Sequence, residues 1–241
     1  MSRNTILGTL VALAFGALGT WLGVDLGAIE DALFVDNQAQ AENVATSSSA
    51  DADADFDFYL LALSWSPTFC SDSGGRSQQQ CGPGKRYGFI THGLWPQYER
   101  GYPESCQTGQ RRDVSSSIQD QMLDIMPDRG LIGHQWRKHG TCSGLSQRDY
   151  FNKVRAATRS ITVPKQFRTP DRERRLSARD MENAFAAANP DLDFNKMAIR
   201  CDRGRVREVR ICLTKALEPR VCREVDARGC QQQNLRLPVP K

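Results

Sequence analysis

Eight cysteines restrict what this 241-residue chain can fold into more than any other feature of its sequence. An even number of cysteines in an exported chain indicates a set of disulfide bonds. Zinc ligation is the alternative, but the sequence has no C-x-x-C pair and no Cys/His cluster at zinc spacing. Four bridges are therefore expected, although spacing alone does not decide among the possible pairings. The cysteines are Cys70, Cys81, Cys106, Cys142, Cys201, Cys212, Cys222 and Cys230.

The first 41 residues resemble an export segment. Arg3 precedes the apolar run ILGTLVALAFGALGTWLGV, which stays uncharged until Asp25. Ala39-Gln40-Ala41 resembles a cleavage site, although it lies far beyond the run, and the run is nearly long enough to span a bilayer. We therefore expect residues 1–41 to be a signal peptide, with an uncleaved N-terminal anchor as the alternative. The protein is then periplasmic or secreted, and contacts a membrane only if the segment is uncleaved.

The composition changes after this segment. Residues 42–55, ENVATSSSADADAD, are small, polar and acidic, which predicts a flexible linker before a folded domain over 56–241. The whole chain carries a net charge of +4, and residues 1–41 contribute −3, so that the remainder carries +7. A basic exported domain favours an anionic partner such as nucleic acid. The basic stretches 168–175 and 203–210 could attract an RNA backbone, but a solvated surface is the more ordinary interpretation.

Hydrophobic patterning predicts both strands and helices. Strands are expected at 56–65, 86–95, 197–201 and 206–213, with a loop over 66–85. Helices are expected from an N-cap at Asp113 to Met126, over 131–139 with a stop at Gly140, over 147–160, and from a capping box at 177–180 to Ala188. Because these elements do not alternate regularly, we expect an α+β fold. It would be a single disulfide-bonded domain with a central antiparallel sheet and several packed helices.

The three histidines of the chain fall in two short motifs, THGLWPQ (91–97) and HQWRKHG (134–140). On a helix over 131–139, Gln135 and His139 share a face, as do His134 and Lys138. A metal site is not expected, because the two histidines are five residues apart and Lys138 would repel a cation. A lone histidine is ordinarily structural, but three in two motifs fit that interpretation poorly. Cationic surroundings should lower their pKa values and keep them near neutral pH.

These side chains suit acid–base cleavage of a phosphodiester. His92 and His139 can supply the acid and the base. Lys138, with donors from Gln135 and His134, can stabilise the negative charge of the transition state. No metal or other cofactor is needed when the nucleophile is the 2′-hydroxyl of RNA itself. The sequence therefore predicts an RNA substrate and no cleavage of DNA.

Two segments carry a resemblance to a known family. FITHGLWPQ (89–97) and HQWRKHGTC (134–142) resemble the active-site segments of the ribonuclease T2 family, secreted and periplasmic endoribonucleases. YLLALSWSPTFC (59–70) resembles the family's first strand and its cysteine. The run from Cys201 to Cys230 resembles the cysteine framework at the end of the family's domain. The resemblance covers residues 56–230. It implies an α+β fold and cleavage of single-stranded RNA through a 2′,3′-cyclic phosphate to a 3′-phosphate.

Motif position implies a role for each residue. His139 would be the base of the first step, His92 the acid to the 5′-oxygen, and His134 a phosphate ligand, while Lys138 would stabilise the transition state. The family usually has glutamate where this chain has Gln135, which cannot exchange a proton but can donate from its NH₂ group. Activity with an altered rate or pH profile is therefore expected. A binding protein without turnover and a metal-dependent nuclease are the alternatives.

The resemblance also extends to base binding. Trp95 corresponds to a base-stacking tryptophan, with core packing as an equal alternative. Gln97 stands where some members have an acidic base-reading residue, so base preference stays open. Tyr98 and Tyr102 are further candidates, although loop tyrosines are common.

The resemblance implies three disulfides and leaves the fourth to exclusion and proximity. A bridge at Cys142 would anchor His139, which lies three residues before it. We expect a monomer. The implied pairs are Cys106–Cys142, Cys201–Cys230 and Cys212–Cys222, and the fourth is Cys70–Cys81.

Overall fold

The computed structural model describes residues 54–73, 76–168 and 171–239. The predicted signal peptide or anchor, and the predicted linker except for its last two residues, lie outside this part of the chain. In the described ranges, no helix is both long enough and apolar enough to cross a membrane.

The sheet is built on three long strands. β1 (Phe58–Trp65) pairs antiparallel with β2 (Phe89–Gln97) and with β5 (Arg205–Leu213), and β4 (Met197–Asp202) pairs antiparallel with β5. All four strands match the expected segments to within a few residues. The sequence analysis did not predict the short edge strands β3 (Arg174–Leu176) and β6 (Leu235–Leu237), because three residues show no usable alternation.

The central strands β2, β1, β5 and β4 pair antiparallel, as expected, and one edge pairing is parallel. β6 runs parallel to β5, with Arg205 opposite Arg236, so the sheet is mixed at this edge. The connection from β5 to β6 is long enough to bring the chain back to the starting end of β5, which a parallel pair requires.

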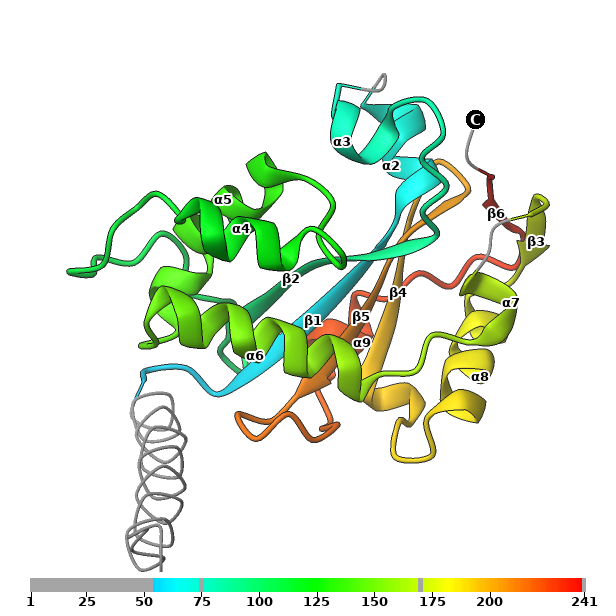
Figure 1. Cartoon of the computed structure of the whole chain (residues 1–241). Helices are drawn as coiled ribbons and strands as arrows, with labels where there is room; N and C mark the ends of the chain where they lie inside the picture. The colour runs from blue at the N-terminus through cyan, green and yellow to red at the C-terminus, as the bar shows by residue number, and fades with distance from the viewer. Residues whose placement is uncertain (1–53, 74–75, 169–170, 240–241) are drawn as a thin grey trace, which may run out of the picture. The chain divides into compact units, whose positions relative to one another are not determined.

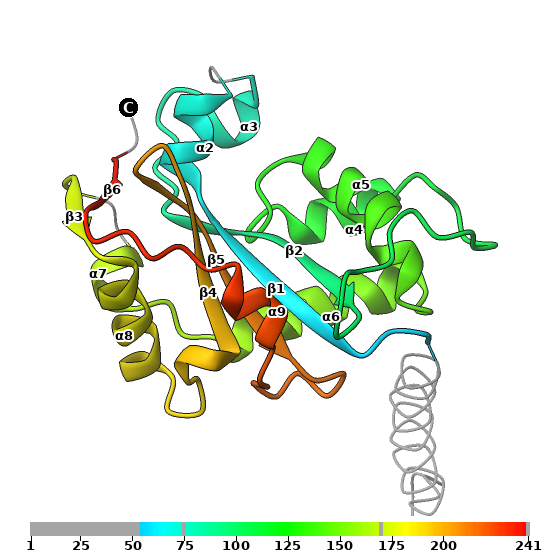
Figure 2. The same ribbon diagram turned by 180° about the vertical axis from the view of Figure 1, so that it is seen from behind.

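Both faces of β1 are buried, which explains its nearly continuous apolar sequence. Tyr59, Leu61 and Leu63 enter the main core. Helices α6 (Gln147–Ser160) and α8 (Ala178–Ala188) cover this face of the sheet (Figure 1). Phe58, Leu60 and Ala62 face the other way, into a smaller cluster with Trp95, and α9 (Arg223–Ala227) lies on that side (Figure 2). This second face carries the candidate site.

The helices agree with the sequence in some places and correct it in others. The expected helices at 147–160 and from the capping box at Ser177 are confirmed as α6 and α8. The predicted helix from Asp113 to Met126 is shorter: α4 (Ser116–Met122) begins after Ser115, whose side chain accepts from the backbone N–H of Ile118. Further helices are α5 (Arg129–Lys138), α7 (Lys165–Arg168), and the short η1 (Gly140–Cys142) and η2 (Phe194–Lys196).

The predicted loop at 66–85 contains two short helices, α2 (Ser66–Asp72) and α3 (Gln78–Cys81). Pro67 starts the first of them, and the Ser77 side chain caps the second. The interpretation as loop was wrong because glycines further along the segment outweighed these start signals.

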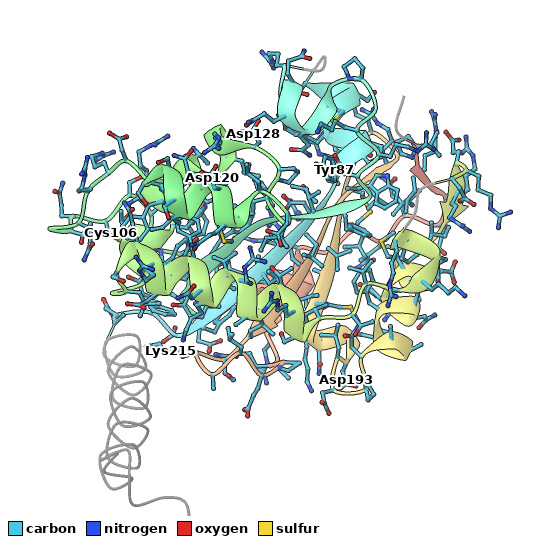
Figure 3. The ribbon with its side chains drawn as sticks, in the orientation of Figure 1. Tyr87, Cys106, Asp120, Asp128, Asp193 and Lys215 are labelled. Atoms are coloured by element: carbon cyan, nitrogen blue, oxygen red, sulfur yellow. A yellow bond between two sulfur atoms is a disulfide. The ribbon has the colours of Figure 1, made fainter. Side chains whose placement is uncertain are left out.

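Helix α5 begins two residues earlier than predicted because Asp128 caps it. The Asp128 carboxylate accepts from the backbone N–H of Leu131 and also from the hydroxyl of Ser77 (Figure 3). The helix ends at Lys138, and His139 is its C-cap, with φ −121° and ψ −44°. His139 therefore lies just beyond the helix on which it was predicted.

Each cysteine is paired as expected: three pairs are those that the resemblance implied, and Cys70–Cys81 is the one left by exclusion and proximity. The sulfurs are joined in the pairs Cys70–Cys81, Cys106–Cys142, Cys201–Cys230 and Cys212–Cys222. Cys106 lies in the long loop after β2 (Figure 3), so its bridge ties this loop to the segment that follows His139.

Candidate active site

A pocket of about 230 Å³ opens on the second face of the sheet. Its lining comes from β1, β2, β5, the end of α5, α9 and the loop after β2. Phe58 and Leu60 form part of its floor. All the residues that the sequence proposed for the site lie here: His92, Trp95, Gln97, Tyr98, Tyr102, His134, Gln135, Lys138 and His139.

A β-bulge directs His92 into the pocket. The register between β1 and β2 pairs Ala62 with Gly93 but Leu63 with Thr91, so His92 has no partner on β1. Such an extra residue changes the direction of its side chain relative to simple alternation. Thr91 points to the opposite side, where its hydroxyl bonds to Thr158 of α6. The His92 side chain keeps 34% of its surface exposed.

Gly93 lets β2 and α5 approach closely. A Cβ atom at this position would lie 2.1 Å from Oε1 of Gln135 and 2.4 Å from Nε1 of Trp95. Any side chain would therefore displace Gln135 from the site.

Gln135 is buried and bonded to Trp95. The indole Nε1–H donates to Oε1 of Gln135 at 2.6 Å. Because an indole N–H can only donate, the amide oxygen must face it and the NH₂ group must point elsewhere. In this orientation the NH₂ group is the donor that Gln135 can offer, and its role toward a substrate stays a prediction.

Trp95 lies between the two catalytic candidates. The ring of His139 stacks on it at 4.9 Å with an interplanar angle of 23°, and His92 meets it edge-on at 5.3 Å. The guanidinium of Arg210 lies over the same ring at 5.2 Å. With Trp95 buried by these neighbours, the geometry favours packing over base stacking for this residue.

The other base-site candidates differ in exposure. Tyr102 is 48% exposed, and its ring lies 6.4 Å from that of His139. Tyr98 is half-buried. Gln97 is buried, and its amide donates to the carbonyl of Pro96 at 2.7 Å. Tyr102 is thus the candidate that an incoming base can reach most easily.

The surroundings of His139 keep it neutral. It is only 5% exposed, and burial, reinforced first by the charge of Lys138, lowers its pKa to about 3. The sequence predicted lowered histidine pKa values that stay near neutral pH. This prediction is wrong for His139, because the burial that lowers its pKa depends on tertiary packing. Burial and Lys138 also lower the pKa of His134. In the part of the chain that the structure describes, Nδ1 of His139 has no hydrogen-bond partner.

Lys138 has a carboxylate partner that the sequence analysis missed. Oε2 of Glu104 lies 3.2 Å from its Nζ atom. The loop that carries Glu104 is tied to α5, because the N–H of Ser105 donates to the Lys138 carbonyl at 2.7 Å. The bridge from Cys106 to Cys142 fixes the same loop.

β5 contributes two further residues that the sequence analysis missed. Oε1 of Glu208 lies 2.5 Å from Nδ1 of His92, and Oε2 accepts from Nε of Arg210 at 2.9 Å. Burial alone would raise the pKa of Glu208, but the hydrogen bond to His92 and the charge of Arg210 lower it to about 2. Both residues belong to the stretch 203–210, interpreted as solvated surface, yet strand alternation turns them toward the pocket with Cys212.

The ranges that the structure describes contain no cluster of three or more His, Cys, Asp or Glu side chains suited to a metal ion. Metal independence nevertheless stays a prediction for experiment.

Comparison with known proteins agrees with this geometry. Residues 56–222 match the model of the ribonuclease T2 family. A ribonuclease of Aeromonas hydrophila is 48% identical over 92 residues, which make up 38% of this chain and 40% of that protein. The chain therefore matches less than half of the length of this relative.

Solved structures show the same fold. The RNase-related protein from Calystegia sepium has a TM-score of 0.63 at 22% identity and covers 77% of this chain and 98% of its own. RNase NT in complex with 5′-AMP has a TM-score of 0.55 at 22% identity, with 77% and 99% covered. These likenesses confirm the expected α+β fold. Because the family model matches well over half of the sequence, the chain belongs to the ribonuclease T2 family.

Proposed function

We propose that this protein is a metal-independent endoribonuclease that cleaves single-stranded RNA. The observation that carries the proposal is the placement of His92 and His139 against one indole ring, in a pocket that also holds Lys138 and His134. Family membership supports the same activity.

In the first step, His139 is the general base. Its neutral ring takes the proton of the 2′-hydroxyl, and the 2′-oxygen forms a bond to phosphorus. Lys138, His134 and the NH₂ group of Gln135 stabilise the negative charge on the non-bridging oxygens. His92 gives a proton to the 5′-oxygen as the P–O5′ bond breaks. The products are a 2′,3′-cyclic phosphate and a free 5′-hydroxyl.

In the second step, the two imidazoles exchange roles. His92, now deprotonated, takes a proton from a water molecule that attacks the cyclic phosphate. His139 returns its proton to the 2′-oxygen as the P–O2′ bond breaks. A 3′-phosphate results, and both side chains regain their starting protonation.

The first step requires a 2′-hydroxyl, so the mechanism spares DNA. A base must enter beside Tyr102, which a paired duplex hinders, and this favours single-stranded RNA. The complex of RNase NT with 5′-AMP shows that this structural relative accepts a nucleotide, which supports a nucleotide ligand here.

The activity can be tested by incubating the oxidised, full-length protein with RNA in excess EDTA. We expect 2′,3′-cyclic phosphate ends that convert to 3′-phosphates, while DNA of the same sequence stays intact. Activity lost in EDTA would favour a metal-dependent nuclease. RNA binding without cleavage, unaffected by His92→Ala or His139→Ala, would favour the binding protein that Gln135 allows.

We also propose that the protein is exported, through cleavage near residue 41, and acts as a monomer in the periplasm or outside the cell. The apolar N-terminal run and the disulfides support export. N-terminal sequencing of the exported protein should find a start near Glu42. An intact Met1 start would indicate the anchor instead.

A further inference from the structure

His92 needs an anchor that its own strand does not provide. It is the extra residue of the bulge, and a third of its side chain is exposed to the pocket. An imidazole in this setting can rotate about its Cβ–Cγ bond (χ2), which changes the direction in which each ring nitrogen points. A general acid works only if the nitrogen that carries the transferable proton faces the leaving group.

Glu208 provides that anchor. An ionised carboxylate only accepts hydrogen bonds, so Nδ1 of His92 must carry the proton in the 2.5 Å contact. The ring is then held with Nε2 turned away from Glu208. When His92 carries both ring protons, the two side chains form an ion pair.

Arg210 holds Glu208 in turn. Its Nε and its terminal amino group both lie 2.9 Å from Oε2, while Oε1 is left for His92. The guanidinium also lies over Trp95, against which His92 packs. Strand β5 thereby fixes both the carboxylate and the ring that borders the imidazole.

Stability alone does not account for this carboxylate. Glu208 is 9% exposed and lies in the sheet between Ser64 of β1 and Arg200 of β4. Burying a charge is unfavourable even when it is paired, and a neutral replacement often stabilises a fold. Its two oxygens are instead directed at His92 and Arg210.

We propose that Glu208, held by Arg210, is a positioning residue that orients His92 as the proton donor to the 5′-oxygen. The inference rests on the function proposed above and adds a third segment, on β5, to the two histidine motifs.

The test compares two substrates that differ in their leaving group. A dinucleotide such as UpA loses an alkoxide that needs a proton, whereas uridine 3′-(4-nitrophenyl phosphate) loses a stable phenolate that does not. Glu208→Gln keeps the shape of the side chain but removes its charge. We expect kcat/KM to fall on the order of 100-fold for UpA and less than about fivefold for the nitrophenyl ester.

The ratio of the two losses separates positioning from folding, because misfolded protein lowers both rates equally. If Glu208→Gln does not fold, Glu208→Asp, which keeps the charge on a shorter side chain, is measured in the same way. Equal losses on both substrates, or no loss on either, would overturn the proposal.

Two controls sharpen the result. Glu182→Gln removes another buried carboxylate, on α8 and paired with Arg179, and should change neither rate by more than about twofold. In a His92→Ala background, adding Glu208→Gln should have little further effect on UpA cleavage, and a full additional loss would contradict the proposal. A wild-type protein that cleaves neither substrate would instead refute the proposed function.

Discussion

His92 and His139 are the same side chain in opposite surroundings. His92 sits on a bulged strand, partly exposed, with a carboxylate at Nδ1. His139 sits at the end of a helix, buried among cations, and its pKa falls to about 3. Two histidines in such different surroundings can take complementary roles in acid–base catalysis. The comparison assigns proton donation to the first histidine and proton acceptance to the second.

The largest expected effect comes from removing either imidazole. His139→Ala should lower kcat/KM for UpA by roughly 10³-fold, and His92→Ala by a similar factor. The nitrophenyl ester should restore the rate of His92→Ala but not that of His139→Ala, because only the acid becomes unnecessary. Steady-state kinetics on both substrates check this. Restoration of the other variant would reverse the assignment of acid and base.

The second prediction concerns how the free energy of unfolding depends on pH. The folded pKa of His139 lies below its ordinary value of 6.5, so the unfolded state binds the extra proton and stability falls as pH drops below 6.5. Between pH 7.5 and 5.0 the wild type should lose about 2 kcal/mol more unfolding free energy than His139→Gln. Urea unfolding at both pH values measures the difference. Equal losses in the two proteins would show that His139 titrates normally.

The third prediction concerns a carboxylate placed near His139. Gln135→Glu restores the residue usual in the family, and its oxygen can still accept from Trp95. The added negative charge should favour the protonated imidazole and raise the pKa of His139, which moves the acid limb of kcat/KM upward by about one pH unit. A pH–rate profile measures the shift. An unmoved limb would mean that residue 135 is not electrostatically coupled to the base.

The smallest expected effect concerns Glu104. In the free protein this exposed carboxylate pairs with Lys138, and we expect it to compete with a substrate phosphate. Glu104→Gln should therefore lower KM by up to about fivefold with little change in kcat, since exposed ion pairs are worth at most about 1 kcal/mol. Glu218 does not line the pocket, so Glu218→Gln is the matched control. A higher KM would show that Glu104 instead holds Lys138 in its working position.

The residues of the two motifs could be proposed from the sequence because each motif is local, and the structure places them in one pocket. THGLWPQ and HQWRKHG each place their polar groups within one strand or one helix end, where spacing is informative. Glu208 was missed for the opposite reason. It lies 116 positions from His92, and the pairing of both β2 and β5 with β1 brings the two together. The sequence feature that indicates Glu208 is a carboxylate at an inward-facing position of a strand. The arginines around it favoured the interpretation of 203–210 as solvated surface.

The electrostatics of the site could be predicted in sign but not in size. Lys138 and its neighbours indicated lowered histidine pKa values, and this holds for His134 and His139. The large shift of His139 arises mainly from burial, which depends on how Trp95 and the end of α5 pack together. Packing of this kind is set by tertiary structure and leaves no trace in the spacing of a motif.

In the proposed reaction, two imidazoles cleave RNA through a cyclic phosphate without a metal. Phosphorus NMR of UpA with the oxidised, full-length protein in EDTA tests it directly. We predict that the resonance of uridine 2′,3′-cyclic phosphate appears first and is then replaced by that of uridine 3′-phosphate. A 5′-phosphate product, or an unchanged UpA resonance, would show that the two imidazoles do not cleave RNA in this way.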